Sequence, residues 1–483
     1  MLFGVLGAVL MLAGGSWYQA TVTPPYRFID EQAHAGYVLA VQDGQIPSID
    51  TPIDQASGGS ALRERLATEP ARRQDVWVAN NPPLTYLIAT GPAALTRALG
   101  VPGGPLLGLR LVSVAAVSAA VAVTYLLARD LAGGDRTVGL VAAGLVAAMP
   151  HLGFVASLGF NDGVSLLATT SVLLALARVC GAGVTSPGGR QVQFLGICCA
   201  LAAASRPMAL VVAAVAGALG LAVTWWRHQA PPLWSFGWLA APTVVTSGWF
   251  YLLNLRRYGD PTGSAALFEK FGREPEQSLR FFLTSKGVWE SALRTITTRR
   301  LGVPLPGDSR GWYQVAVVVV VVGVVGATAL VVRSAVIHRR HAKGGSVVAG
   351  ALPGMAWLAL AMVSLLPVLL TAQHRAGGGA PHPRYLFPML PVVAAAVALV
   401  AVRLATRWSG IALVVAVSAV AWQQTRASAR WLADNPAGPP GSELVAAYGT
   451  EVLRGAGLAA AALGLVLLIA TIAGNPNTTV DRS

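Results

Sequence analysis

The stretch from Val315 to Val332 reads VAVVVVVVGVVGATALVV, which is 18 residues without a charged side chain. A helix of this length spans the hydrocarbon core of a bilayer, whereas the strands of a membrane barrel need about 10 residues of alternating polarity. Similar apolar stretches recur along the chain, in which 54% of the 483 residues are hydrophobic and 12% are charged. The sequence therefore predicts an all-α polytopic membrane protein.

We expect about twelve membrane-spanning helices, packed as a single domain that covers residues 1–483. The first segment lacks the charged start of a signal peptide, and we interpret it as the first span. Only Ser205, Arg206 and Pro207 separate the fifth span from the sixth, so the count is open by about one span in either direction. The expected spans begin near residues 2, 107, 138, 164, 194, 208, 233, 313, 347, 385, 411 and 458.

The distribution of basic residues predicts the orientation of the chain. If the N-terminus is cytoplasmic, the short outside turns hold only Arg206, Arg375 and Arg384. The cytoplasmic segments then hold Arg129, Arg136, Arg178, Arg190, Arg227, Arg333, Arg339, Arg340, Lys343, Arg403, Arg407 and Arg482. This excess is the positive-inside bias. We therefore expect a multi-pass protein of the cytoplasmic (inner) membrane.

Three long segments would face outward in this topology: residues 21–106, 257–311 and 423–455. They hold 17 of the 21 acidic residues, and no acid falls in the centre of an expected span. An ion or proton pathway usually needs ionisable groups inside the membrane, so this distribution disfavours one. The net charge of +14 is spread over both faces. We therefore expect membrane lipids and phosphate-bearing ligands as partners, and no nucleic acid.

Two adjacent acids, Asp30 and Glu31, follow the first span and Pro24-Pro25. Apolar spacing from Asp30 to about Gln42 predicts a short interfacial helix, on which Asp30 and His34 share a face because they are four residues apart. The two acids are either helix N-terminal charges favoured by the helix dipole or a reaction centre at the membrane surface.

Other candidate site residues lie in the short outer turns. Asn161 and Asp162 are either a helix cap or a second carboxylate site that holds an acceptor or a metal. Arg206 and Arg384 are either snorkelling residues at the ends of spans or ligands of a phosphate, and Tyr385 would stack on a sugar or an isoprenoid. Metal binding is left open, with Asp30, Glu31 and Asp162 as the ligands of a divalent ion.

The order of the motifs resembles that of the GT-C superfamily of bacterial integral membrane glycosyltransferases, in particular a largely uncharacterised branch of predicted membrane proteins. The resemblance covers about residues 1–400. The motifs are the acidic pair at Asp30, Asn-Pro-Pro-Leu-x-Tyr from Asn81, Asn161-Asp162, Ser205-Arg206-Pro207, Arg-x-Tyr-Gly-Asp-Pro-Thr-Gly from Arg256 and Pro383-Arg384-Tyr385-Leu-Phe-Pro388. Related proteins often carry His at the position of Asn81.

The resemblance implies a GT-C-like helical bundle that transfers a sugar from a polyprenyl-phosphate-linked donor. The acceptor would be a cell-envelope glycan, lipid or protein at the outer face. Asp30 matches the catalytic base, with Glu31 beside it, and Asp162 matches the second acid. A base would take the proton of the acceptor hydroxyl, and the lipid phosphate would leave as an anion beside a cation or a metal. Two alternatives stay open: a transporter or flippase of lipid-linked sugars, and a non-catalytic protein that binds envelope lipids.

Overall fold

The structure, a computed structural model, describes most of the chain. The described residues are 1–26, 30–60, 62, 74–101, 104–181, 189–228, 233–275, 277–298, 309–341, 347–434 and 451–475. They form helices, without a β-sheet; one isolated antiparallel bridge joins Pro52 and Asp75. The expectation of an all-α protein is therefore confirmed for the described residues. Much of the predicted outer segment 423–455 lies outside them.

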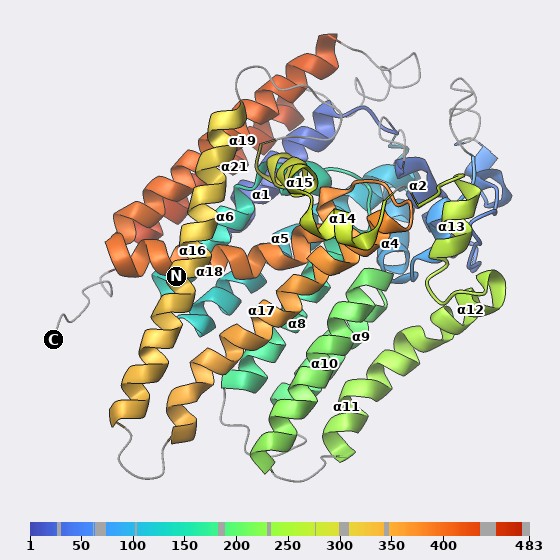
Figure 1. The fold of residues 1–483 in the computed structure, drawn as a ribbon. Coiled ribbons are helices and arrows are strands. Elements are labelled where there is room, and N and C mark those ends of the chain that lie inside the picture. The colour runs from blue at the N-terminus through green and yellow to red at the C-terminus, as the bar shows by residue number, and fades with distance from the viewer. Residues whose placement is uncertain are drawn as a thin grey trace.

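The helices follow one another along the whole of the described chain (Figure 1). In order they are α1 (Leu2–Val22), α2 (Glu31–Gln42), η1 (Ile53–Gln55), η2 (Trp77–Asn80), α4 (Leu84–Ala98), α5 (Gly104–Leu131), α6 (Arg136–Ala147), α7 (Pro150–Ala156), α8 (Asp162–Gly181), α9 (Arg190–Ala203), α10 (Pro207–His228), α11 (Leu233–Thr243), η3 (Val244–Gly248), α12 (Trp249–Tyr258), α13 (Ser264–Lys270), α14 (Leu279–Thr284), α15 (Lys286–Thr298), α16 (Ser309–His341), α17 (Val347–Ala376), η4 (Pro383–Met389), α18 (Leu390–Val400), η5 (Ala401–Ala405), α19 (Arg407–Asp434) and α21 (Glu451–Ala473).

Among the described residues, eight helices are long and apolar enough to span a membrane. A ninth span is obtained if α6 and α7, which meet at an angle of 65°, are counted together. The expected count of about twelve is not confirmed. The apolar stretch near residue 138 is broken where Pro150 starts α7, and α9, near residue 194, has only 14 residues.

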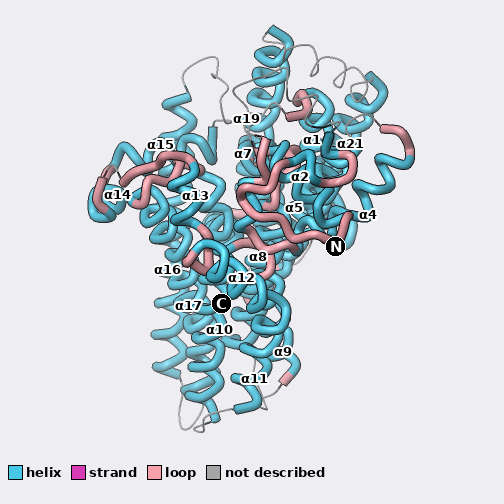
Figure 2. The backbone as a smooth tube through the Cα atoms, turned by 90° about the vertical axis from the view of Figure 1, so that its right-hand side faces the viewer, coloured by secondary structure: helices cyan, strands magenta, loops and turns pink. Residues whose placement is uncertain are grey.

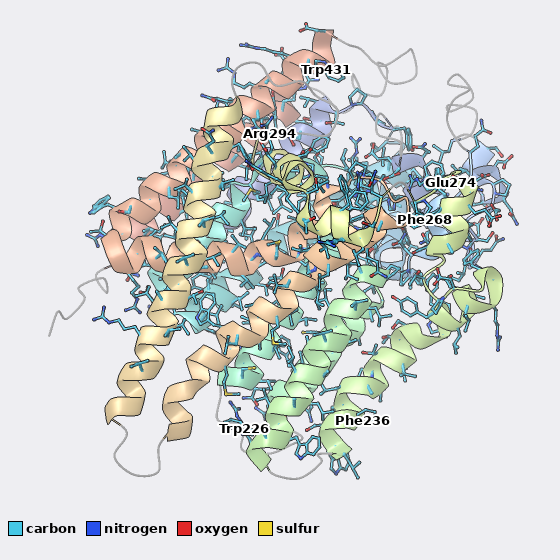
Figure 3. The ribbon with its side chains drawn as sticks, in the orientation of Figure 1. Trp226, Phe236, Phe268, Glu274, Arg294 and Trp431 are labelled. Carbon is cyan, nitrogen blue, oxygen red and sulfur yellow. The ribbon has the colours of Figure 1, made fainter. Side chains whose placement is uncertain are left out.

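The short helices gather at one end of the bundle (Figures 1 and 2). There α2, α4, α13, α14 and α15 lie together, while α10, α11, α16 and α17 extend to the opposite end. At that opposite end Trp226 and Phe236 expose more than half of their surface, remote from Phe268 of α13 (Figure 3). Exposed aromatic residues at helix ends are typical of a membrane–water interface.

The segment between α1 and α5 has a hydrophobic core of its own. Tyr37, Leu39, Trp77 and Tyr86 are buried in it and pack against α5. Eleven of the 12 residues of α2 are buried. A short helix was predicted here, but its apolar spacing predicted one that lies flat on the membrane interface. The structure instead encloses α2 on all sides, because η1, η2 and α4 fold over the face that would otherwise meet water.

Helices α1 and α21, from the two ends of the described chain, pack closely in antiparallel directions. Gly7 lies against Gly464 and Gly14 against Gly457, so glycines seven residues apart form a seam on each helix. A Cβ atom on Gly7 would be 2.6 Å from the carbonyl oxygen of Gly464. Small residues allow such close approach of backbones in a membrane, where packing supplies much of the association energy.

We expect Gly464→Ala to lower the thermal stability of the protein in detergent. Its Cβ would lie 2.5 Å from the carbonyl oxygen of Gly7, and such overpacking costs about 1–3 kcal/mol. The control is Gly455→Ala on the same helix, where no atom lies within 4 Å of the added carbon. That change should leave the melting temperature unchanged or raise it slightly, since alanine favours a helix by about 0.5–1 kcal/mol. Equal shifts in the two variants would contradict the seam.

Candidate functional site

Asp30 lies directly before α2, and its side chain forms an ion pair with a residue more than 350 positions away. Its Oδ2 accepts a hydrogen bond of 2.8 Å from Nη2 of Arg384 in η4. Asp30 occupies the N-cap position, yet its side chain makes no capping hydrogen bond. The carboxylate is therefore directed toward Arg384, away from the exposed amides of its own helix.

Arg384 also reaches the second candidate acid. Its Nη1 lies 3.7 Å from Oδ2 of Asp162, whose Oδ1 accepts a hydrogen bond from Arg206. Asp30, Arg384, Asp162 and Arg206 thus form a row of alternating charges without net charge, which we call the charge row. From the sequence we expect Asp30, Glu31 and Asp162 to converge, with Arg206 or Arg384 beside them. The structure brings Asp30 and Asp162 together with both arginines, but it pairs Glu31 with Arg110 instead.

Three helices begin at the charge row. Asp30 precedes α2, Asp162 is the first residue of α8, and Arg206 precedes Pro207, the first residue of α10. Helix N-termini carry partial positive charge and free amide groups, so they stabilise anions. Together with two guanidinium groups, these N-termini make one end of the bundle favourable for an anionic ligand.

Aromatic rings border the charge row. The guanidinium of Arg384 lies 4.7 Å from the ring centre of Phe160, and that of Arg206 lies 5.4 Å from the ring centre of Tyr385. His382 packs edge-on against Tyr385, with ring centres 5.6 Å apart. Burial and, to a lesser extent, the charge of Arg384 lower the pKa of His382 to about 3. His382 is therefore a neutral neighbour of the row at physiological pH.

Glu31 points away from the charge row and is fully buried. Each of its carboxylate oxygens accepts a hydrogen bond of 2.9 Å from Arg110. The backbone N–H of Gly159 donates to Oε1 at 3.0 Å, and that of Tyr26 donates to Oε2 at 3.1 Å. We call this group the Glu31–Arg110 clamp. Four donors occupy the two oxygens, so we propose a structural role for Glu31 in place of the catalytic or metal-binding one expected from the sequence.

The clamp fastens four parts of the chain to one another. Nη1 of Arg110 also donates to the carbonyl oxygens of Ala20 (2.9 Å) and Thr23 (3.1 Å), at the end of α1. Glu31 starts α2, Arg110 belongs to α5, and Gly159 lies in the turn between α7 and α8. The clamp therefore holds the start of α2 in place and, with it, the adjacent Asp30.

Asp30 is the most accessible acid of the site. Its side chain is 26% exposed, compared with 4% for that of Asp162. Burial raises the pKa of Asp30, but the charge of Arg384 and its hydrogen bond to the carboxylate outweigh this effect and lower the pKa to about 2. Asp30 is thus ionised at neutral pH and partly open to a ligand, as a proton acceptor must be.

His34 lies one turn along α2 from Asp30 and is buried. Its Nδ1 is 2.8 Å from the hydroxyl of Tyr86, and its ring centre is 5.3 Å from that of Phe160. Burial lowers the pKa of His34 to about 3, although the charge of Asp30 acts in the opposite direction. The neutral imidazole therefore positions groups beside the charge row, and its link to Tyr86 explains one residue of the Asn-Pro-Pro-Leu-x-Tyr motif.

Two buried amides near the charge row have no hydrogen-bond partner among the described residues. Neither the nitrogen nor the oxygen of Gln32, on α2, is satisfied, and the same is true of Asn161, next to Asp162. An unsatisfied buried polar group costs about 1–3 kcal/mol, so native proteins tend to retain one where a ligand or water completes it. Both amides are candidates for hydrogen bonds to a polar ligand.

The site does not fit a divalent metal ion in this arrangement. Arg384 occupies the space between the carboxylates of Asp30 and Asp162, and the oxygens of Glu31 are already taken. No group of three or more His, Cys, Asp or Glu side chains converges among the described residues. Carboxylate-rich oxygen cages suit such ions, and this pairing of acids with guanidinium groups does not supply one.

Arg110 is the site residue that the sequence analysis missed. An ionisable residue inside an apolar stretch marks a functional or paired group. Arg110 lies inside the expected span that begins near residue 107, so the criterion identifies it when it is applied to arginines as well as to acids. Gln32, Tyr86 and Phe160 carry no such signal, since their roles depend on which helices meet.

The comparisons with known proteins concern overall fold. A scan against models of protein families and a search of curated proteins find no match. Among solved structures, ArnT from Cupriavidus metallidurans, bound to undecaprenyl phosphate, is similar with 13% identity and a TM-score of 0.49; the match covers 96% of this chain and 77% of ArnT.

Two structures from Archaeoglobus fulgidus are also similar. An oligosaccharyltransferase in complex with Zn and sulfate has 14% identity, a TM-score of 0.44 and coverage of 86% of this chain. The oligosaccharyltransferase AglB in complex with an inhibitory peptide and a dolichol-phosphate has 12% identity, a TM-score of 0.42 and coverage of 88% of this chain. This chain matches 53% and 55% of their lengths. At these identities the likeness concerns the fold alone.

We expect Glu31→Gln to destabilise the fold more than a comparable change at the surface. Removing one partner of a buried ion pair leaves the charge of Arg110 uncompensated, at a cost of about 3–5 kcal/mol. The control is Glu290→Gln, which removes a half-exposed pair with Arg294 one turn along α15 and should cost at most about 1 kcal/mol. Thermal unfolding in detergent measures both. Similar losses of stability in the two variants would show that the Glu31–Arg110 clamp stabilises the fold no more than a surface ion pair does.

The pH dependence of stability should reveal the lowered pKa of His34 in the folded protein. The unfolded chain takes up a proton near pH 6.5, whereas the folded chain does so near pH 3, because burial favours the neutral ring. Stability from His34 is complete above about pH 6.5 and is lost progressively as the pH falls toward 3. The melting temperature of the wild type should therefore drop more steeply between pH 6.5 and 4 than that of His34→Gln. Parallel curves would mean that His34 has the same pKa in the folded and the unfolded protein.

Proposed function

We propose that this protein transfers a sugar from a polyprenyl-phosphate-linked donor to a cell-envelope acceptor at the outer face of the cytoplasmic membrane. The observation that carries the proposal is the charge row, in which an accessible, ionised carboxylate shares a guanidinium with a second acid. Such a site offers a base for an acceptor hydroxyl and cations for a leaving phosphate.

The donor phosphate is proposed to bind at Arg384 and Arg206. A guanidinium offers a planar fork of donors that matches phosphate oxygens, and both groups lie where helices begin. Tyr385, which is half-buried under Arg206, presents an aromatic face for the sugar or the first isoprene unit. Phosphate binding there requires no additional cation, because the phosphate would replace a carboxylate as the partner of a guanidinium that is already present.

Partner exchange links donor binding to the base. As the phosphate takes the hydrogen bonds of Arg384, Asp30 loses the neighbour that holds its pKa near 2. Burial, the largest single influence on Asp30, then raises its pKa. Asp30 thereby becomes a stronger base when the donor is in place, which couples activation of the acceptor to the presence of the sugar.

The reaction is a single displacement. The acceptor hydroxyl oxygen forms a bond to the anomeric carbon while the bond from that carbon to the phosphate oxygen breaks. The hydroxyl proton moves to Asp30, and the electron pair leaves with the polyprenyl phosphate, whose anion Arg384 and Arg206 stabilise. Attack from the face opposite the phosphate inverts the anomeric centre. Asp162 keeps both guanidinium groups in position, and Gln32 and Asn161 are proposed to hold hydroxyl groups of the substrates.

The transporter alternative is less well supported by the described residues. A transporter is expected to carry its ionisable groups near the midplane, between broken helices. The four members of the charge row instead lie at or before the first residues of α2, α8, α10 and α18, at one end of the bundle. A non-catalytic lipid-binding role would not need an accessible acid beside two cations.

We expect Asp30→Asn to reduce transfer about 10²–10⁴-fold, the usual contribution of a positioned general base, with little loss of donor binding. Arg384→Gln should weaken donor binding, since it removes a charge-assisted contact with the phosphate. The assay incubates purified protein with radiolabelled polyprenyl-phospho-sugars and membrane extract and follows transfer. Asp50→Asn serves as the control, because Asp50 is 71% exposed and lies outside the charge row. Full transfer by Asp30→Asn would remove Asp30 from the mechanism.

A further inference from the structure

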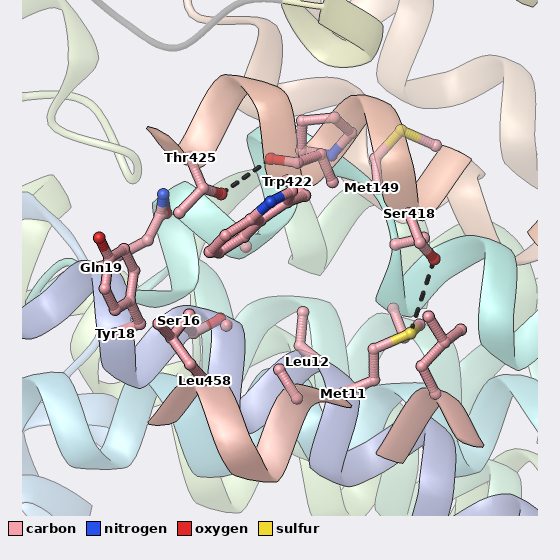
Figure 4. A pocket seen from close by; sticks show the side chains of 18 of the residues that line it. Met11, Leu12, Ser16, Tyr18, Gln19, Met149, Ser418, Trp422, Thr425 and Leu458 are labelled. Atoms are coloured by element: carbon pink, nitrogen blue, oxygen red, sulfur yellow. Dashed lines mark hydrogen bonds between the residues drawn. The ribbon is translucent and has the colours of Figure 1, made fainter. Parts of the chain in front are cut away.

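A cavity of about 410 Å³ lies away from the charge row, between α1, the α6–α7 break, α19 and α21 (Figure 4). Tyr18 and Gln19 lie at one end of it and Met11 and Ser418 at the other. Its volume falls in the range of small-molecule sites. Two of its walls, α1 and α21, are candidate membrane spans.

The cavity contains polar side chains that are not satisfied by the protein. Ser16 and Gln19 are 0% and 2% exposed, and the Ser16 hydroxyl and both amide atoms of Gln19 have no hydrogen-bond partner among the described residues. Ser418, in the opposite wall, behaves differently, since its hydroxyl donates to the carbonyl oxygen of Val414 on its own helix at 2.7 Å. A hydroxyl in a helix commonly donates to the carbonyl oxygen four residues earlier, as Ser418 does, whereas Ser16 makes no such hydrogen bond.

The lining also excludes one class of lipid. None of the lining residues that the structure describes is charged. A polyprenyl phosphate carries a single polar group, an anion, which this lining cannot neutralise. A neutral ester is different, because its carbonyl oxygen accepts a hydrogen bond from an amide N–H or a hydroxyl and its chain matches the apolar wall.

We propose that this cavity binds one acyl chain of an ester-linked membrane lipid, with the ester carbonyl accepting a hydrogen bond from Nε2 of Gln19. The chain would extend from Gln19 toward Met11 along α1. The end at Gln19 adjoins Ala20, whose carbonyl oxygen accepts a hydrogen bond from Arg110 in the clamp. This inference concerns lipid binding and does not depend on the proposed transferase activity.

Native mass spectrometry of the protein after delipidation tests the proposal. The probes are diacyl phosphatidylglycerol, its dialkyl ether analogue with chains of equal length, and undecaprenyl phosphate, each added to the delipidated protein. We expect one ester lipid to bind about five- to tenfold more tightly than the ether, the value of one hydrogen bond. Preferential binding of undecaprenyl phosphate at this cavity, or equal binding of ester and ether, would overturn the proposal.

Two variants locate the lipid in this cavity. Gln19→Leu should abolish the preference for ester over ether, and Gly15→Leu should reduce binding of both, because its side chain enters the open space beside Gly15. Gly217→Leu is the matched control, since Gly217 lies on α10, also with open space and outside this cavity. Circular dichroism and melting temperatures confirm that the variants fold. An unchanged ester preference in Gln19→Leu, or unchanged binding in Gly15→Leu, would contradict the assignment.

Discussion

The buried ion pair between Glu31 and Arg110 is the constraint on which the rest of the site depends. Two charges removed from water are stable only if their geometry is good and their remaining hydrogen-bonding capacity is used. Here backbone amides complete the carboxylate, and backbone carbonyls at the end of α1 complete the guanidinium. The added partners belong to the end of α1 and the residues after it and to the turn between α7 and α8, so satisfying the pair also fixes where these parts meet.

The clamp explains why two neighbouring acids have different surroundings. Successive residues of a helix point about 100° apart, so fixing Glu31 toward α5 directs Asp30 toward η4. Glu31 is enclosed and saturated with donors, whereas Asp30 has one guanidinium partner and remains 26% exposed. An ionised acid that is both anchored by its neighbour and open on one side is preorganised to accept a proton. The fold thus places the acid that we propose to be structural directly beside the acid that we propose to be the base.

The sequence predicted the helical class, because stretch length sets the class. It also predicted that Asp30, Glu31 and Asp162 would converge beside Arg206 or Arg384, because the topology places these residues at one membrane face; Glu31 is the exception. It did not distinguish Glu31 from Asp30, since side-chain direction at the start of a helix depends on which partner is near. The sequence also did not predict the burial of α2. Amphipathic spacing shows that a face is apolar, and only the tertiary structure shows that η1, η2 and α4 cover the other faces. The role of Glu31 and the orientation in the membrane remain predictions.

The charge row is costly in a protein that is otherwise apolar, and this cost bears on function. A buried pair of this kind is often no more stable than apolar residues of the same volume, so stability alone does not account for four charges in one place. A row of alternating charges can, however, exchange one anion for another without exposing a bare cation. A phosphate that replaces Asp30 beside Arg384 keeps the guanidinium paired and frees a carboxylate in the same step. The folded protein therefore already holds, side by side, the guanidinium and the carboxylate that the proposed transfer would require at the same moment.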